Sequence, residues 1–227
     1  MAAPSNKMWP RKNATKTGHE DVMVPVEKED LTLDPDTAHP ELEISADGKE
    51  VKCGSCKKNV SCSPRQFDTA NCVVARQSFS SGRHYWEVFV GQKPRWNLGV
   101  VSERAERQGR LIQKTSGSGE VCAEGYWLIG YDKEKPRKPY WAFHTNQMPF
   151  ECSPHPETIG VYLDYTAGEV TFYNPEDPDN LIPLYSFYNA AFKNAPVKAA
   201  FEDAPIYPFF DPCWHDNGVN AQPLKIL

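Results

Sequence analysis

Four cysteines in the first third of the sequence are the residues whose spacing most suggests chemistry. Cys53 and Cys56 are separated by two residues, as the first ligand pair of many zinc sites is. Cys62 and Cys72 follow after longer intervals that match no zinc pattern. We therefore expect no bound metal, with a zinc site as the alternative. The 7 cysteines are interpreted as reduced thiols, because the chain shows no export signal.

The acid and base groups do not form a recognisable catalytic set. His215 and Asp216 are neighbours, but adjacent side chains on a strand or turn point apart, and no motif places a serine beside them. Glu87 lies between aromatic residues and could be a general acid; we favour a structural partner of a buried arginine or backbone group. The motifs of serine hydrolases, P-loop proteins, zinc proteases and EF-hands are absent. The sequence predicts no enzyme activity and no cofactor.

The elements that would position these groups are short strands. Side chains alternate along Arg83–Val90, so one face would carry His84, Trp86, Val88 and Val90. The segment as a whole is rich in aromatic and β-branched residues, as expected of a strand in a packed sheet. We therefore expect Trp86 and Trp127 to be core residues.

Further strand-like segments are separated by turn residues, in keeping with 20 prolines and 14 glycines. They are Leu42–Ser45, Glu50–Cys53, Cys72–Gln77, Trp96–Ser102, Gly125–Tyr131, Tyr140–Phe143, Thr158–Asp164, Glu169–Tyr173, Leu184–Phe187, Ile206–Phe209 and Leu224–Leu227. Many short strands without long helices predict an all-β fold, a two-sheet antiparallel β-sandwich. One short helical turn is expected at Asp34–His39, with Asp34 as its cap and Pro35 in the first position.

Composition and charge argue against two further classes of protein, those that bind nucleic acid and those that span a membrane. The net charge of −5 gives no basic footprint for nucleic acid, so no nucleic-acid partner is expected. No apolar run is long enough to span a membrane, and no secretory signal is visible. Residues 1–28 lack apolar periodicity and are expected to form a disordered leader. Without a heptad pattern we expect a monomer, in the cytoplasm or alternatively the nucleus.

Three longer stretches carry a family resemblance. Ser81–Gly91 contains Gly-Arg-His-Tyr-Trp-Glu-Val, which resembles the signature of the B30.2 (PRY-SPRY) domain of the tripartite-motif family. Leu31–Pro40 resembles its upstream Leu-Asp-Pro motif, and Val161–Asn174 resembles its downstream Leu-Asp-Tyr motif. The resemblance covers residues 29–227, with a PRY part at about 29–80 and a SPRY part at about 81–227. It implies a concanavalin-like jelly roll whose loops at one end bind a protein ligand.

The resemblance also suggests where a ligand would bind. Residues at family recognition positions, or beside them, are Asn97, Tyr126, Gly130, Asp132, Trp214 and His215. An antibody-binding relative has an acidic residue in place of Asn97 and tryptophans in place of Gly130 and Asp132, so its ligand is not expected here. Trp214 is either a binding anchor or a lid on the core edge, and the two interpretations stay open.

Two functions compete at this point. The first is non-catalytic recognition of a protein ligand, as the substrate-reading part of a tripartite-motif ubiquitin-ligase system. The second is association with an anionic membrane surface, because several stretches resemble the mitsugumin-like, membrane-repair branch of the family. A basic cluster would then meet lipid: Arg95, Arg104, Arg107, Arg110 and Lys114. Loops at Thr115–Glu124 and Asp132–Pro156 are where specificity would differ from relatives.

Overall fold

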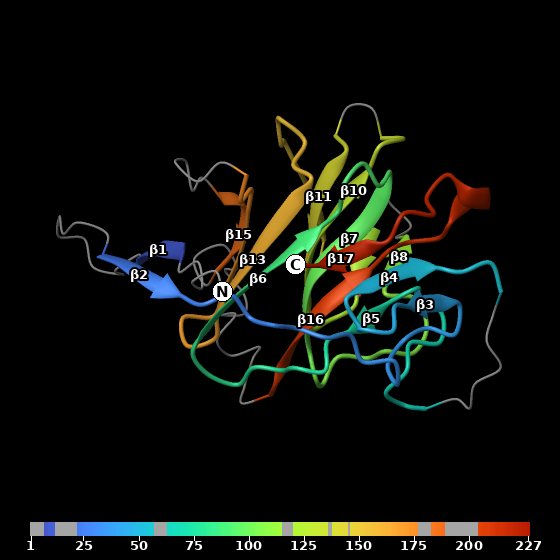
Figure 1. The fold of residues 1–227 in the computed structure, drawn as a ribbon, viewed down its shortest axis with the longest axis horizontal. Helices are drawn as coiled ribbons and strands as arrows, with labels where there is room; N and C mark the ends of the chain where they lie inside the picture. Colours follow the sequence, from blue (N-terminus) through green and yellow to red (C-terminus); the bar gives the residue numbers. More distant parts are fainter. Residues whose placement is uncertain are drawn as a thin grey trace.

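The computed structural model describes residues 7–11, 22–56, 63–114, 120–135, 138–144, 146–176, 183–188 and 204–227. Two antiparallel sheets stack face to face and form a β-sandwich (Figure 1). The predicted all-β, two-sheet class is confirmed. Within the described ranges, helical structure is confined to η1, a single 3₁₀ turn at Asp216–Gly218, and no helix is long and apolar enough to cross a bilayer.

The first sheet has seven strands in the order β15-β14-β13-β6-β17-β4-β3. They are β3 (Leu42–Ile44), β4 (Glu50–Cys53), β6 (Arg83–Phe89), β13 (Thr158–Asp164), β14 (Glu169–Tyr173), β15 (Pro183–Phe187) and β17 (Leu224–Ile226). β13 pairs with β6 along its whole length. β17, near the C-terminal end, lies between β6 and β4, so both ends of the domain are needed to complete this sheet.

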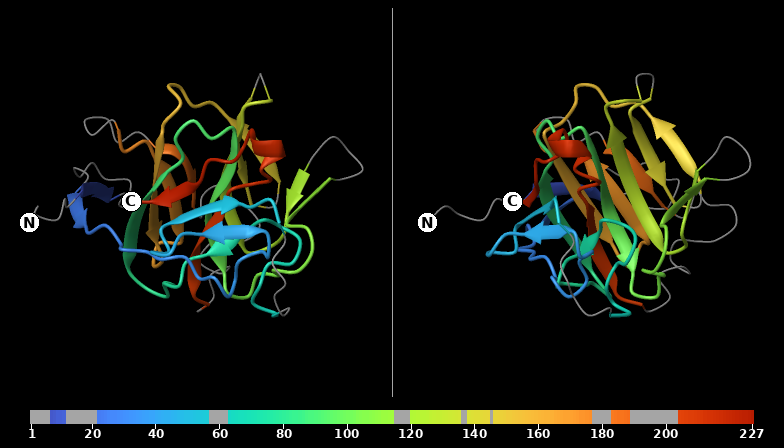
Figure 2. Two further views of the ribbon diagram at one scale, coloured as in Figure 1. Left: turned by 45° about the vertical axis from the view of Figure 1, so that its right-hand side comes forward. Right: turned by 90° about the vertical axis from the view of Figure 1, so that its right-hand side faces the viewer.

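The second sheet has six strands in the order β12-β11-β10-β7-β16-β5. They are β5 (Val73–Val74), β7 (Arg95–Ser102), β10 (Tyr126–Asp132), β11 (Tyr140–Phe143), β12 (Gln147–Phe150) and β16 (Ile206–Asp211). β5 from the first part of the domain pairs with β16 from the second part. The two predicted parts therefore share both sheets, and Figure 2 shows the layers in two further orientations.

Two small hairpins project from opposite sides of the sandwich (Figure 2). One is β1 (Lys7–Arg11) with β2 (Val22–Val26), inside the predicted leader; the other is β8 (Ile112–Lys114) with β9 (Glu120–Cys122). Sequence reasoning did not find these four strands, nor β12. Val26 is buried against tyrosines of the seven-stranded sheet, and Lys28 forms a bridge to Tyr85. The end of the leader is thus attached to the domain, whereas the disorder of the rest stays a prediction.

The space between the sheets is filled by alternate residues of facing strands. Trp86 is 1% exposed and Trp127 is fully buried, so both tryptophans are core residues as predicted. The predicted face of β6 and the hairpin β13–β14 supply much of the cluster: Val88, Val90, Ile159, Val161, Leu163, Val170 and Phe172. His84 is the exception, because it stacks on Phe79 at 3.7 Å and bonds Glu29 (Nδ1–Oε1 2.7 Å) near the edge of the sheet.

A second apolar layer covers the outer face of the six-stranded sheet. Its members include Tyr126, Leu128, Phe143 and Phe209 from the strands, together with Phe67 and Leu111 from the segments that cross over them. Arg107 is 7% exposed, and its guanidinium lies 5.7 Å from the Phe67 ring centre.

The expected helical turn at Asp34–His39 is wrong. Thr37 N donates to Asp34 O (3.0 Å) and Ala38 N donates to Pro35 O (3.3 Å), which makes overlapping turns and no helix. The cap-like bond is present, since Asp36 N donates to the Asp34 carboxylate (3.2 Å). His39 N then bonds Cys72 O, and this long-range contact ends the turn after one cycle. Tertiary contacts therefore outweigh the local helical preference.

Candidate binding site

A row of residues crosses the outer face of the six-stranded sheet at one end. The strand register places Trp141 of β11 beside Gly130 of β10, Gly130 beside Asn97 of β7, and Asn97 beside Asp211 of β16. The Asn97 Nδ2 group donates to Asp211 Oδ2 (2.8 Å) and approaches Cys213 Sγ (3.5 Å). Side chains two apart on a strand share a face, so Tyr126 and Asp132 lie on this side as well. The structure thus places four of the predicted residues, Asn97, Tyr126, Gly130 and Asp132, on one face of the sheet.

Gly130 leaves the space that two larger side chains occupy. A Cβ atom there would lie 2.2 Å from Asn97 Oδ1 and 2.4 Å from Trp141 Nε1. Both of these buried polar atoms lack a hydrogen-bond partner among the described residues. Trp141 is in turn capped by Lys135, whose Nζ lies 4.1 Å from the ring centre. Because Gly130 has no side chain, Trp141 and Asn97 can both approach its backbone closely.

The loop after β16 is closed by one buried asparagine. Asn220 Nδ2 donates to the carbonyl oxygens of Pro212 (3.0 Å) and Trp214 (2.8 Å). Its Oδ1 accepts from the Arg95 backbone N–H (3.3 Å). These three hydrogen bonds hold residues 212–220 in place. Within this loop Cys213, Asp216 and Asn217 have positive φ angles, which cost free energy for residues other than glycine.

Lys93 is the second brace of this loop. Its side chain is fully buried, and Nζ donates to the carbonyl oxygens of Asn220 and Gln222 (2.8 Å each). Burial lowers the pKa of Lys93 to about 8, against the opposing effect of Cys213 and Asp211. Desolvation raises the pKa of Asp211, although the hydrogen bond from Asn97 favours its charged form. Lys93 and Asp211 each favour the charged form of the other, against the larger effect of burial.

Trp214 and His215 lie on the outside of the braced loop. Trp214 is 47% exposed, and its ring centre lies 4.6 Å from that of His215. The exposure argues against the interpretation of Trp214 as a lid on the core edge. Val219 in the same loop is 72% exposed. The loop therefore presents apolar side chains to solvent on a backbone that is held from beneath.

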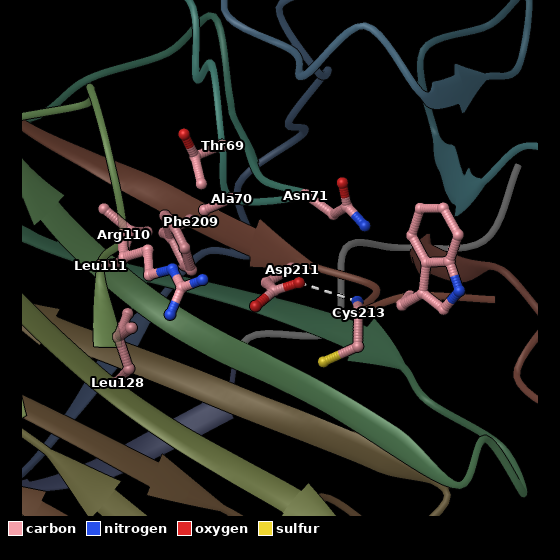
Figure 3. Close-up of a pocket in the computed structure, with 10 residues that line it drawn as sticks. Thr69, Ala70, Asn71, Arg110, Leu111, Leu128, Phe209, Asp211 and Cys213 are labelled. Atoms are coloured by element: carbon pink, nitrogen blue, oxygen red, sulfur yellow. Dashed lines mark hydrogen bonds between the residues drawn. The ribbon is translucent and has the colours of Figure 1, made fainter. Parts of the chain in front are cut away.

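A pocket of about 440 Å³ opens beside this loop (Figure 3). Its lining comes from four parts of the chain: Thr69, Ala70, Asn71, Arg110, Leu111, Leu128, Phe209, Asp211, Cys213 and Trp214. Trp214 is the one predicted site residue in this lining. The pocket joins the first part of the domain, which supplies residues 69–71, to the second part, which supplies the rest.

The other predicted residues lie around the pocket rather than in it. Tyr126 is buried, and its hydroxyl donates to Glu106 O (2.6 Å), so it supports the face from below. Asp132 lies at the end of β10, where its carboxylate accepts from Glu134 N (2.9 Å). Direct contact of a ligand with Tyr126 or Asp132 stays a prediction.

The predicted basic cluster is divided by the fold. Arg107 is buried and donates from Nη1 to Arg65 O (3.0 Å), and Arg95 forms an ion pair with Asp216. Arg104 and Arg110 are exposed, whereas the side chain of Lys114 lies outside the described residues. The five residues therefore do not form one common basic surface.

The sequence offered two further chemical candidates, Glu87 and the cysteines, and the structure shows the surroundings of each. Glu87 pairs with Lys28 (2.9 Å) and accepts from the Tyr85 hydroxyl (2.6 Å), which supports the structural interpretation of Glu87. Cys53 and Cys72 belong to different apolar clusters, and Cys62 lies outside the described residues. No group of three metal-ligating side chains occurs within the described ranges; the absence of zinc stays a prediction.

Sequence reasoning missed the residues that hold the site together. Lys93, Asp211 and Asn220 carry no motif, and a lysine beside a proline in a turn would ordinarily be assigned to solvent. One signal was available, since Lys93 and Asp211 lie within two stretches, 93–100 and 207–218, that match recognition positions of the resembling family. The burial of Lys93, however, depends on carbonyl groups more than a hundred residues away.

Comparison with known proteins agrees with this architecture. Residues 31–79 match the SPRY-associated domain (PRY), and residues 83–221 match the SPRY domain. Tripartite motif-containing protein 72 is 45% identical over 202 residues in Xenopus tropicalis and 40% identical over 200 residues in Homo sapiens, in each case over 88% of this chain. The chain spans only 38% of the length of these relatives.

A solved structure gives the same result for the fold. The structure described as the crystal structure of the TRIM65 PSpry domain superposes with a TM-score of 0.61 at 24% sequence identity, covering 88% of this chain and 90% of that chain. The two matched segments together account for most of the chain and coincide with the two parts that share the sandwich. The chain therefore belongs to the PRY-SPRY (B30.2) family.

Proposed function

We propose that this chain is a non-catalytic protein-recognition module, which binds a protein ligand at the end of the six-stranded sheet with Trp214 as an anchor. The observation that carries the proposal is the exposure of Trp214 on a loop braced by Asn220 and Lys93. A rigid, exposed aromatic beside a pocket gives a large contact area at a small cost in conformational entropy. The His215 ring lies 4.6 Å from that of Trp214, and Asn97 Nδ2 approaches the neighbouring Cys213 Sγ (3.5 Å), which supports a shared site.

The wider role follows from the relatives. The curated relatives are tripartite-motif proteins of which this chain spans 38%. We propose that the module is the ligand-reading part of a tripartite-motif ubiquitin-ligase system, in which transfer of ubiquitin would need other domains. The purified chain, supplied with only ubiquitin-activating and ubiquitin-conjugating enzymes, is expected to form no ubiquitin chains.

Recognition is tested with peptides selected from a random display library on the full chain. Trp214→Ala should weaken the selected peptides by roughly 30-fold, as the loss of an interface anchor worth about 2 kcal/mol does. The thermal midpoint should stay unchanged, because Trp214 lies outside the core. Val219→Ala is the matched control, since it truncates another exposed apolar side chain of the same loop. Equal binding by Trp214→Ala and the parent would place the site elsewhere.

Association with an anionic membrane surface is the weaker candidate. Arg104 and Arg110 remain exposed, but Arg95 and Arg107 are engaged within the fold. Liposomes that contain phosphatidylserine should therefore sediment only a small fraction of the chain. Liposomes of neutral lipid should sediment the same small fraction. Strong, salt-sensitive retention by the anionic liposomes alone would favour this function over protein recognition.

A further inference from the structure

The walls of the pocket indicate what kind of ligand residue it takes; this inference rests on the recognition function proposed above. Leu111, Leu128 and Phe209 form an apolar wall, and each comes from a different element of the chain. All three are buried and packed within the outer apolar layer, so the wall is fixed before any ligand arrives. A pocket of about 440 Å³ has room for one large apolar side chain together with its flanking peptide groups.

Two polar groups face each other across this wall. Figure 3 shows the guanidinium of Arg110 pointing toward the side of the pocket where Asp211 lies. Asp211 accepts from Cys213 N (2.7 Å), from Asn97 Nδ2 (2.8 Å) and from the Cys213 thiol. A carboxylate has about four acceptor sites, so Asp211 retains one for a ligand, and the guanidinium of Arg110, which carries five N–H donors, lies in the same lining.

The pocket presents charged groups of both signs before any ligand binds. Asp211 is attracted by the buried amine of Lys93 from beneath, and Arg110 supplies a further positive charge at the wall. A lysine or arginine side chain entering the pocket would meet this positive charge, and an acidic side chain would meet Asp211. Either one would also lose its hydration against an apolar wall, which is costly for a charged group. An uncharged side chain avoids both penalties.

We propose that this pocket binds one uncharged aliphatic residue of an extended peptide segment. The side chain packs against Leu111, Leu128 and Phe209. Arg110 donates to a carbonyl group of the flanking main chain, and Asp211 accepts from a main-chain N–H. A peptide group offers one donor and one acceptor that must both be satisfied on burial, and this pair of residues matches them. The subsite includes Trp214 in its lining and adjoins Asn97, which donates to Asp211 (2.8 Å).

The test uses small probes and NMR spectroscopy of the full chain labelled with ¹⁵N. N-acetyl-leucine N-methylamide should shift the amide signals of Thr69, Ala70, Asn71, Leu111 and Leu128 saturably, with an affinity on the order of millimolar for a ligand this small. N-acetyl-glycine N-methylamide, which lacks the side chain, should leave these signals unchanged. N-acetyl-lysine N-methylamide should bind at least about tenfold more weakly than the leucine probe.

A blocking variant and its control give a second measurement. Thr69 is exposed at the pocket, so Thr69→Trp should fill the opening and abolish the shifts at Leu111 and Leu128 without disturbing the core. Thr166→Trp places the same bulk on an exposed turn between β13 and β14 and should leave probe binding unchanged. Both variants should keep the thermal midpoint of the parent.

Failure of this inference is distinguishable from failure of the proposed function. Absent shifts, equal shifts with the glycine or lysine probe, or full binding by Thr69→Trp would overturn the aliphatic subsite. Trp214→Ala would still report on recognition through the selected peptides. Conversely, normal peptide binding by Trp214→Ala with leucine-specific shifts at the pocket would overturn the Trp214 anchor and support the subsite.

Discussion

Trp86 and Trp214 are the same side chain in opposite surroundings. Trp86, on β6, is 1% exposed within the apolar core between the sheets. Trp214 is 47% exposed, on a loop whose backbone is held by Asn220 and Lys93. Apolar contact specifies the first region, and buried polar groups specify the second. Changes in the core should therefore alter the stability of the whole domain, whereas changes in the loop should alter the shape of one surface.

The largest expected effect is that of Trp86→Ala. Loss of a fully buried tryptophan should lower the free energy of unfolding by roughly 3–5 kcal/mol, through lost burial and the cavity that remains. The matched variant Trp214→Ala should change it by less than about 0.5 kcal/mol, as exposed substitutions do. Chemical denaturation of both variants measures the contrast. Similar losses for the two would mean that the loop is part of the cooperative core.

Gly130→Ala should have the next largest effect. The new Cβ would lie 2.2 Å from Asn97 Oδ1 and 2.4 Å from Trp141 Nε1, so one of these side chains must move. Overpacking of this kind typically costs about 1–3 kcal/mol. A double variant with Asn97→Ala removes one of the colliding atoms and should recover part of the loss. Additive effects of the two substitutions would show that Gly130 and Asn97 are not coupled.

The pH dependence of the unfolding free energy should report the burial of the Lys93 amine. Burial lowers its pKa to about 8, from 10.5 for an unburied lysine. Below pH 8 the amine is protonated in both the folded and the unfolded states, so its contribution is constant. Between about pH 8 and pH 10.5 the unfolded chain retains the proton that the folded chain has lost, so stability rises with pH.

Lys93→Met isolates this contribution. The parent should gain about 2 kcal/mol of unfolding free energy relative to the variant when the pH rises from about 7.5 to about 10. Burial also raises the pKa of Tyr85, which opposes folding at high pH, but this effect is common to both proteins and cancels. A difference that does not vary with pH would mean that the Lys93 amine is hydrated in solution.

The smallest expected effect is that of chelators and reductants. Burial raises the pKa of the thiols of Cys53, beneath the loop, and Cys213, within it. Both cysteines are free, so neither is part of a disulfide. We expect the thermal midpoint to be unchanged by a zinc chelator or by a thiol reductant. Metal analysis that finds about one zinc per chain, or a midpoint that falls on reduction, would contradict this expectation.

The strands were predictable where residues alternate in polarity and turn residues bound them. Glu50–Cys53, Tyr140–Phe143, Thr158–Asp164 and Glu169–Tyr173 have the predicted ends. β12 and the hairpin β8–β9 were missed, because they lie in polar stretches that form strands by pairing with a neighbour rather than by burying an apolar face. Local pattern therefore locates the strands of the core better than those of the periphery.

Sequence alone determined the all-β class, the core face of β6 and the stretches that carry the family motifs, because these depend on residue order within a few positions. Tertiary structure alone decided which of the proposed binding residues face a common surface. In the folded chain Arg107 is buried and Asn97 donates a hydrogen bond to Asp211. Lys93 lies under a loop that follows it in the sequence by more than a hundred residues. Hydrogen bonds and charge balance of this kind depend on distances in space, which periodicity along the chain does not encode.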